Sequence, residues 1–199
     1  MTFRLGLTGS IGMGKSTTVR MFAARGYPVW DADAAVRRLY AKGGAAIEPV
    51  AKAFPSALRD SAIEKDALKE QISNDPGALT RLEEIVHPLV ASDRALFIDE
   101  AKAASAEIVV LDIPLLYETG AESQMDGVAV VSTDAATQRK RVLSRPGMTE
   151  HQFELIKSRQ IPDAEKRARA DWIIPTDNLQ AAEQAVAVIC REILESRDA

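Results

Sequence analysis

The sequence is short of several residue types, and each shortage excludes a class of protein. Among its 199 residues there is one cysteine, Cys190, so no disulfide can form within the chain. A four-cysteine zinc site is impossible, and the only two histidines, His87 and His151, argue against a histidine-rich metal site. Aromatic residues make up 5% of the chain, which argues against a surface that stacks nucleic-acid bases.

An excess of positive charge is also absent. Lys and Arg number 25 against 29 Asp and Glu, so the formal net charge is −4 and we expect no general attraction to nucleic acid. No apolar run approaches the roughly 20 residues of a membrane helix, and no signal-peptide pattern is evident. With 46% hydrophobic residues the chain can form a core. We therefore expect a cytoplasmic globular protein, a monomer or small homo-oligomer, with no membrane or nucleic-acid partner.

Short apolar strands alternate with helical patterns towards both ends of the chain. Strands are predicted at 3–8, 27–31, 108–111, 128–131 and 171–174. Continuously apolar strands are typical of parallel sheets buried on both faces, and helices between them favour a doubly wound α/β core. One predicted helix, 16–25, is followed by Gly26 as a C-cap. The last, 179–194, places Leu179, Ala182, Val186, Ile189 and Ile193 on one face.

Two stretches interrupt this alternation. Residues 34–106 are predicted to be entirely helical, with a break forced by Pro88. A second helical stretch runs from about residue 135 to 168, and within it Thr149 and Gln152 predict a capping box. Both stretches follow strand ends, where open α/β sheets bind ligands, so we interpret them as insertions on the core.

One motif carries a specific chemistry. The segment Gly9-Ser10-Ile11-Gly12-Met13-Gly14-Lys15-Ser16 matches the phosphate-binding pattern G-x-x-x-x-G-K-[ST]. Its glycines let successive N–H groups point at phosphate oxygens, and the following helix adds the positive end of its dipole. Lys15 can reach the β- and γ-phosphates, the Ser16 hydroxyl can ligate Mg²⁺, and Thr17 can meet the α-phosphate. The alternative is an ordinary glycine-rich turn between a strand and a helix.

Carboxylates follow two of the predicted strands. Asp112 ends an apolar strand and is a candidate ligand of Mg²⁺, the alternative being a cap of the next turn. Asp31 and Asp33 follow another strand, and one of them could accept a hydroxyl proton as a general base. The alternative for Asp33 is the N-cap of a helix that starts at Ala34.

Three arginines lie close together on a predicted helix. Arg141 and Arg145 are four residues apart and hence on one face, whereas Arg139 faces elsewhere. An anion between Arg141 and Arg145 would relieve their repulsion, and the alternative is a solvated basic face. Cys190 is expected to be a small core residue.

Taken together, these segments resemble the dephospho-CoA kinase family over nearly the whole chain. The resemblance rests on 7–17, Asp31-Ala32-Asp33, Val86-His87-Pro88, 112–118, and on Thr137, Gln138, Arg141, Arg145, Gln160, Lys166 and Asp171. Two departures stand out. Met13 occupies a position that is often serine, and we expect the loop to tolerate it. Pro175-Thr176-Asp177 replaces the usual Asp-Asn after the last strand.

The resemblance implies an α/β fold and a phosphoryl-transfer reaction. The fold would be a P-loop NTPase-like three-layer α/β/α core with a five-stranded parallel sheet, a helical substrate-binding insertion and a helical lid. Residues 1–33, 107–138 and 168–199 would form the nucleotide-binding core, 34–106 the CoA-binding insertion and 139–167 the lid. The reaction would be ATP-dependent phosphorylation of the ribose 3′-hydroxyl of dephospho-CoA, the last step of CoA biosynthesis, with Mg²⁺.

The resemblance also assigns roles to residues. The ATP-binding residues would be Gly9, Gly12, Met13, Gly14, Lys15, Ser16 and Thr17, and the metal would be held by Ser16 and Asp112. The catalytic residues would be Asp33, Lys15, Arg141 and Arg145. Dephospho-CoA would be bound by Asp33, His87, Pro114, Leu115, Leu116 and Glu118. Three alternatives remain: another small-molecule or nucleotide kinase, a regulatory GTPase, and a P-loop interaction module. The GTPase is disfavoured because the chain has no Asn-Lys-x-Asp segment for guanine.

Overall fold

The computed structural model describes residues 1–196 and divides the chain into two compact units. The first unit comprises Met1–Val29 and the chain from Ala101 onward, and the second comprises Trp30–Glu100. Each unit has its own cluster of buried apolar residues. Across residues 1–196, no helix combines the length and the apolar character that crossing a membrane requires.

The regular elements are distributed over the chain as follows. Those of the first unit are β1 (Phe3–Thr8), α1 (Lys15–Ala24), β5 (Ile108–Asp112), η2 (Ala121–Gln124), β6 (Gly127–Ser132), α6 (Ala135–Leu143), α7 (Glu150–Ser158), α8 (Asp163–Arg169), β7 (Trp172–Pro175) and α9 (Leu179–Glu195). Those of the second are α2 (Ala32–Tyr40), α3 (Ile47–Ala53), η1 (Pro55–Ala57), β3 (Leu58–Arg59), β4 (Ala62–Ile63) and α4 (Lys65–Asn74). The strand β2 (Val29–Asp31) and the helix α5 (Ala78–Ala103) contain the points at which the chain passes between the units.

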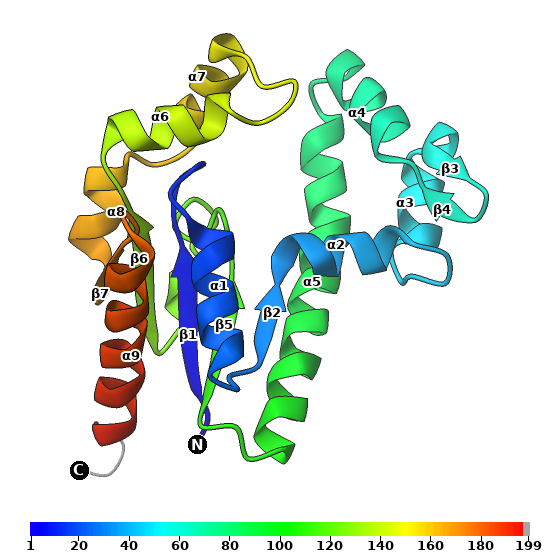
Figure 1. The fold of residues 1–199 in the computed structure, drawn as a ribbon. Helices are drawn as coiled ribbons and strands as arrows, with labels where there is room; N and C mark the ends of the chain where they lie inside the picture. Colours follow the sequence, from blue (N-terminus) through cyan, green and yellow to red (C-terminus); the bar gives the residue numbers. More distant parts are fainter. Residues whose placement is uncertain (197–199) are drawn as a thin grey trace. The chain divides into compact units, whose positions relative to one another are not determined.

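The sheet has five strands in the order β2-β5-β1-β6-β7. β1 pairs in parallel with β5 and β6, and β6 pairs in parallel with β7. All residues of β5 and β6 are buried, as expected for strands covered on both faces. Helices α1 and α9 lie side by side against the sheet (Figure 1) and contribute Phe22, Val186 and Ile189 to the core of this unit. The prediction of a parallel sheet flanked by helices is therefore confirmed.

The strand order places β1 between β5 and β6, so the connections that leave β1 and β5 diverge. In an open α/β sheet this point of divergence, at the carboxyl ends of the strands, forms a crevice for ligands. The loop between β1 and α1, residues 9–14, lies at this end of the sheet, and α6 and α7 lie at the same end (Figure 1). The fold thus presents the predicted phosphate-binding segment where ligands bind.

Several helix boundaries are as predicted. Gly26 follows α1 with φ of +87° and Tyr27 N–H donates to Phe22 O, which completes a C-terminal cap. At α7, Thr149 and Gln152 form both hydrogen bonds of the capping box. Along α9 the predicted apolar face is buried except at its first residue, Leu179, which is 64% exposed.

The segment 34–106 is not entirely helical, contrary to the prediction. β3 and β4 form a two-stranded antiparallel hairpin within the second unit. Asp60 and Ser61, at its turn, have φ of +48° and +62°, a conformation that glycine usually provides. Because the turn carries no glycine and each strand has two residues, the sequence gives little sign of the hairpin.

The predicted break at Pro88 is also absent. Pro88 lies inside α5, which continues without interruption. A proline within a helix forfeits a hydrogen bond and usually costs about 3 kcal/mol. Before it, Leu82 and Val86 are buried in the core of the second unit, and after it Leu89 and Val90 pack against the same core. This apolar packing on both sides of Pro88 explains why the helix persists.

Candidate active site

The loop after β1 requires its glycines. A Cβ atom on Gly9 would lie 2.3 Å from Val131 Cγ2, and one on Gly12 would lie 2.5 Å from Val142 Cγ2. Gly12 and Gly14 also have positive φ, +79° and +94°, and Gly14 is the N-cap of α1. A larger residue would clash with β6 at position 9, with α6 at position 12 and with Thr176 at position 14, and it would strain the backbone at positions 12 and 14. The loop is therefore shaped by close packing and is more than a flexible turn.

Met13 is accommodated in this loop by burial. Its side chain is 3% exposed and belongs to the core under α1 and α9. The Thr133 N–H donates to its sulfur over 3.3 Å, and the Thr176 hydroxyl donates to its carbonyl oxygen over 2.7 Å. The two positions at which the chain departs from the family pattern, Met13 and the segment Pro175-Thr176-Asp177, are thus joined by a direct hydrogen bond.

Lys15 and Asp112 form an ion pair beside the loop. Lys15 is the first residue of α1, and Asp112 ends β5 opposite Leu7 of β1. The Lys15 Nζ lies 2.5 Å from Asp112 Oδ1, and the two side chains are 18% and 8% exposed. Ser16, next in the helix, is exposed. The structure therefore brings together the Lys15 ammonium and the Asp112 carboxylate, which the sequence placed in two separate segments.

Of Asp31, the last residue of β2, and Asp33, only Asp31 caps a helix. Asp31 is the N-cap of α2, and its Oδ1 accepts a hydrogen bond of 2.8 Å from Ala34 N–H. The alternative that Asp33 caps this helix is therefore wrong. Asp33 is exposed in the first turn of α2, in the second unit. Its carboxylate is not needed to begin the helix.

The three arginines have separate surroundings, and the prediction that they share one helix is wrong. α6 ends at Leu143, so Arg145 lies beyond it and is exposed, since Pro146 and Gly147 stop the helix there. Arg141 donates to the Thr176 carbonyl oxygen over 2.6 Å and to the Thr176 hydroxyl over 3.1 Å. Arg139 forms an ion pair with Glu150. Arg141 and Arg145 therefore do not share one face of a single helix.

In the segment that follows β5, residues 113–118, some of the predicted binding residues are buried and others are exposed. Leu116 is fully buried, while Leu115 is 42% exposed. The Pro114 carbonyl oxygen accepts from the Thr8 hydroxyl over 3.1 Å, which fixes the segment to β1. Tyr117 lies under the Arg169 guanidinium, 4.2 Å from its ring centroid, and burial raises the pKa of Tyr117 to about 12.

Glu118 is engaged by protein groups. Its Oε1 lies 2.7 Å from the Nζ of Lys166, a lysine with no exposed side-chain surface, and accepts a 2.9 Å hydrogen bond from Ile161 N–H. A buried lysine requires such a partner, because an isolated charge is costly away from water. These contacts indicate that Glu118 anchors the chain around Ile161. Sequence reasoning did not foresee this pair, since an alternating charged helix gives no sign of which lysine is buried.

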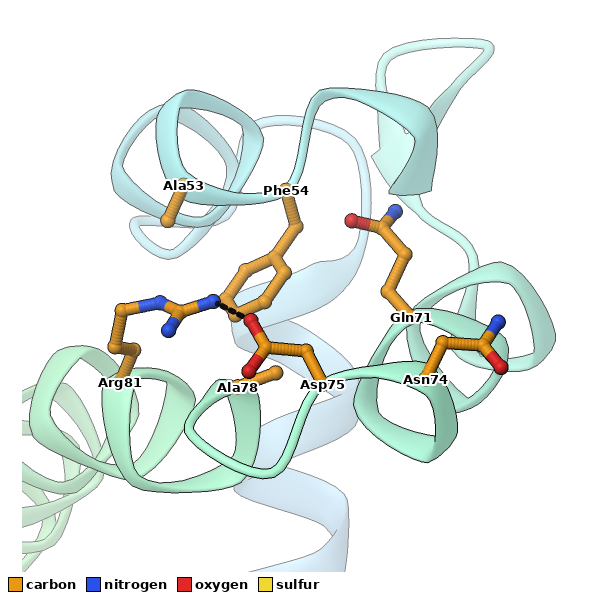
Figure 2. A pocket seen from close by; sticks show the side chains of 7 residues that line it. All are labelled: Ala53, Phe54, Gln71, Asn74, Asp75, Ala78 and Arg81. Atoms are coloured by element: carbon orange, nitrogen blue, oxygen red, sulfur yellow. Dashed lines mark hydrogen bonds and ion pairs between the residues drawn. The ribbon is translucent and has the colours of Figure 1, made fainter.

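The second unit contains a small pocket of about 230 Å³. The residues that line it are Ala53, Phe54, Gln71, Asn74, Asp75, Ala78 and Arg81 (Figure 2). Arg81 NH2 lies 2.6 Å from Asp75 Oδ2, and its guanidinium lies over the Phe54 ring. His87, on α5, is exposed and does not line the pocket. The pocket combines amide groups with one ion pair, and no sequence motif pointed to it.

The fold and the loop define a class: this is a P-loop kinase. The sequence model of the dephospho-CoA kinase family matches residues 3–182, and the chain belongs to that family. It is 56% identical to a dephospho-CoA kinase of Cereibacter sphaeroides over 99% of this chain and 98% of that protein. It is therefore an ATP-dependent phosphotransferase of CoA biosynthesis, as the resemblance implied.

Solved structures share the fold. A crystal structure of a Thermus thermophilus protein superimposes with a TM-score of 0.82 at 32% identity, covering 96% of this chain and 97% of that one. The fold is shared with a Campylobacter jejuni dephospho-CoA kinase at a TM-score of 0.64 and 22% identity, covering 96% and 97% of the two chains.

Proposed function

We propose that this chain phosphorylates the ribose 3′-hydroxyl of dephospho-CoA through the phosphate loop, the Lys15–Asp112 pair and Asp33. The observation that carries the proposal is the ion pair between Lys15 and Asp112 at the carboxyl end of β5, directly beside the loop. Phosphoryl transfer needs positive charge placed where negative charge develops on the transferring group. Lys15 supplies such a charge on the first turn of a helix.

The loop amides and Lys15 would bind the triphosphate of ATP. The positive φ of Gly12 and Gly14 lets backbone N–H groups turn inward, and the N-terminal end of α1 adds its dipole. When the triphosphate binds, the Lys15 ammonium exchanges Asp112 for phosphate oxygens. The developing charge on the transferring phosphoryl group is then neutralised by groups that are already in place.

Mg²⁺ is the metal that this donor set fits. The Ser16 hydroxyl and the Asp112 carboxylate are hard oxygen ligands, and Mg²⁺ commonly takes one or two protein oxygens together with phosphates and water. In residues 1–196 no group of three or more metal-ligating His, Cys, Asp or Glu side chains occurs. When bound, the ion would neutralise phosphate charge.

Asp33 is the proposed general base. It is exposed, and the capping of α2 is performed by Asp31, so the Asp33 carboxylate is available to accept the proton of the 3′-hydroxyl. Removing that proton as the oxygen attacks raises its nucleophilicity. Arg141 and Arg145, in the proposed lid 139–167, would close over the phosphates and exclude water, so that transfer to the alcohol outcompetes hydrolysis.

Residues of the second unit and of the segment after β5 are the proposed contacts of the acceptor. We assign 34–106 to the CoA moiety, with His87, Pro114 and Leu115 as contacts, while Leu116 and Glu118 support that segment from the core. The pocket shown in Figure 2 offers the side-chain amides of Gln71 and Asn74, which match the amide groups of a pantetheine arm. Because its substrates are cytosolic metabolites, we place the enzyme in the cytoplasm.

The test is an ADP-release assay with ATP and Mg²⁺ across a panel of alcohol acceptors. We expect ADP release above the acceptor-free rate with dephospho-CoA, together with formation of CoA. The panel includes nucleosides and other small alcohols, which represent the alternative kinase substrates. If dephospho-CoA stays at the acceptor-free rate while another alcohol is consumed, the acceptor has been assigned incorrectly.

A further inference from the structure

The backbone of Ile11, in the phosphate loop, is held from two sides by glutamine side chains. The Ile11 N–H donates to Gln160 Oε1 over 3.0 Å, and Gln138 Nε2 donates to the Ile11 carbonyl oxygen over 2.8 Å. Gln138 belongs to α6, and Gln160 follows the end of α7. Two side chains distant from the loop in sequence therefore fix both polar backbone groups of one loop residue.

The chemistry of each bond is unambiguous. A backbone N–H can bond only to an acceptor, so Gln160 must present its oxygen to Ile11. A carbonyl oxygen can bond only to a donor, so Gln138 must present its NH₂ group. Gln160 thus acts purely as an acceptor towards the loop and Gln138 purely as a donor, although the two side chains are chemically identical.

Both glutamines are themselves firmly placed. Gln138 is 4% exposed. A Cβ on Gly12 would lie 3.1 Å from the backbone carbonyl oxygen of Gln138, so α6 packs directly against the loop. Next to Gln160, the Ile161 N–H donates to Glu118, which in turn pairs with the fully buried Lys166. Side chains supported in this way hold a partner group in one geometry.

We propose that Gln138 and Gln160 are positioning residues that hold the phosphate loop in its binding conformation before ATP arrives. They act through Ile11. A loop that binds phosphate through backbone N–H groups loses affinity when its peptide groups are free to rotate. The free energy needed to order these groups then opposes binding. The expected consequence is an effect on ATP binding with little effect on the acceptor. The inference rests on the ATP-binding role proposed for this loop.

The same substitution at the two positions tests the proposal. Gln160→Glu keeps an oxygen for the Ile11 N–H, whereas Gln138→Glu replaces the donor with an oxygen that faces the Ile11 carbonyl oxygen. Each variant adds one negative charge near the loop, so each controls for electrostatic repulsion of ATP in the other. Gln184→Glu, on the exposed side of α9, controls for the charge change elsewhere.

The first measurement is amide hydrogen exchange at Ile11 in the nucleotide-free enzyme, followed by NMR. We expect protection to persist in Gln160→Glu and Gln184→Glu and to fall in Gln160→Leu and Gln138→Glu. The second is the Kd of a non-hydrolysable ATP analogue. We expect Gln138→Glu to weaken it about tenfold more than Gln160→Glu, on the scale of one hydrogen bond, and the KM for dephospho-CoA to change less than about threefold in both variants.

The proposal is overturned if the two glutamate variants weaken the analogue equally, or if Ile11 stays protected in Gln160→Leu. Should Gln138→Glu fail to fold, the half-buried Gln160 still decides, because Gln160→Leu must weaken the analogue and Gln160→Glu must restore it. Exchange at Ile11 is measured without nucleotide, so it reports on the hydrogen bonds from Gln138 and Gln160 to Ile11 even if the loop does not bind ATP. A failure of the ATP-binding role would appear separately, as unchanged analogue affinity in Lys15→Ala.

Discussion

The Lys15 Nζ lies 2.5 Å from Asp112 Oδ1, and this contact joins the phosphate loop to the neighbouring strand. Asp112 is opposite Leu7 in the register of β5 and β1, so two adjacent strands deliver the two charges to the same point. The carboxylate is 8% exposed, and a charge so deeply placed needs a partner. In the nucleotide-free protein each of these groups satisfies the other. If the loop binds a triphosphate as proposed, we expect Lys15 to exchange Asp112 for phosphate oxygens.

Lys15→Ala should abolish turnover. The Lys15 ammonium is the charge proposed to reach the transferring phosphate, and losing one preorganised charge of this kind costs about 10²-fold or more in kcat. The melting temperature should also fall, because the ion pair between Lys15 and Asp112 is lost. Both are measured against Lys140→Ala, which removes an exposed lysine of α6. Near wild-type turnover in a folded Lys15→Ala enzyme would rule out the proposed role of the loop.

Asp33→Asn should separate catalysis from stability. Because Asp31 caps α2, replacing Asp33 removes only a favourable first-turn charge, worth about 0.3–1 kcal/mol. As a general base, however, Asp33 should contribute about 10²–10⁴-fold to kcat. Thermal melting and initial rates measure the two effects.

The matched variant for this experiment is Asp31→Ala. It removes the bond to Ala34 N–H and should cost about 1 kcal/mol of stability, with a smaller effect on kcat than Asp33→Asn. A normal kcat in the Asp33→Asn enzyme would show that the general base lies elsewhere.

These two aspartates also show what the sequence could predict. The phosphate loop, Asp112 and the central strands were predictable because each follows a local rule of pattern and spacing. Which of Asp31 and Asp33 caps α2 depends on where the helix starts, and helix starts are uncertain by a residue or two. The same uncertainty placed Arg145 on α6, which ends at Leu143.

The contacts that sequence reasoning missed are tertiary. Lys166 lies in a run of charged residues, and only the fold decides that it is buried against Glu118. Likewise, Pro88 should end a helix by its own chemistry, yet the core of the second unit packs on both sides of it. Local propensity yields to packing in such cases because the packing spans many more contacts.

Asn74→Ala should raise the KM for dephospho-CoA several-fold and leave the KM for ATP unchanged. The reason is the loss of one amide hydrogen bond to the acceptor in the pocket of Figure 2, on the scale of about 1 kcal/mol. The control is Ser73→Ala, because Ser73 is exposed next to Asn74 and does not line the pocket. Equal KM values in wild type and Asn74→Ala would remove the pocket from the acceptor site.

Stability should depend on pH through Asp126. Its carboxylate accepts from the Arg4 backbone N–H and pairs with the Arg4 guanidinium, which holds the pKa of Asp126 below its usual range. A carboxyl whose pKa is lowered by folding stabilises the native state above its unfolded pKa, about 3.9, and loses that contribution as the pH falls through the folded value.

Asp126→Asn should therefore lower the melting temperature at pH 7, and the gap to wild type should narrow below about pH 4. Melting curves from pH 7 to pH 2.5 measure this. Glu183→Gln, an exposed carboxylate of α9, should show no such convergence. A gap that is constant with pH would mean that the contact stabilises through shape rather than charge.

The arginines of the proposed lid should differ in the kinetic step that they affect. Arg145 is exposed after α6, so Arg145→Ala should leave the melting temperature unchanged and lower kcat more than it raises the KM for dephospho-CoA. Arg141 bonds to Thr176, which in turn bonds to the loop at Met13, so Arg141→Ala should lower both kcat and stability. Arg139 pairs with Glu150 at the surface, and Arg139→Ala should cost little.

Hydrogen exchange provides a second measure of the same lid. If Arg145 moves onto the phosphates, exchange in residues 139–159 should slow when the ATP analogue and dephospho-CoA are bound together, because the segment loses its open states. Residues 160–166 should already be protected without ligand, since Gln160, Ile161 and Lys166 are bonded to the core. In the Arg145→Ala variant the ligand-induced protection should disappear while that of 160–166 remains. The lid is removed from the mechanism if exchange along 139–166 is uniform and unaffected by ligands and if all three substitutions have equal, small kinetic effects. The arginines would then belong to an ordinary solvated basic surface.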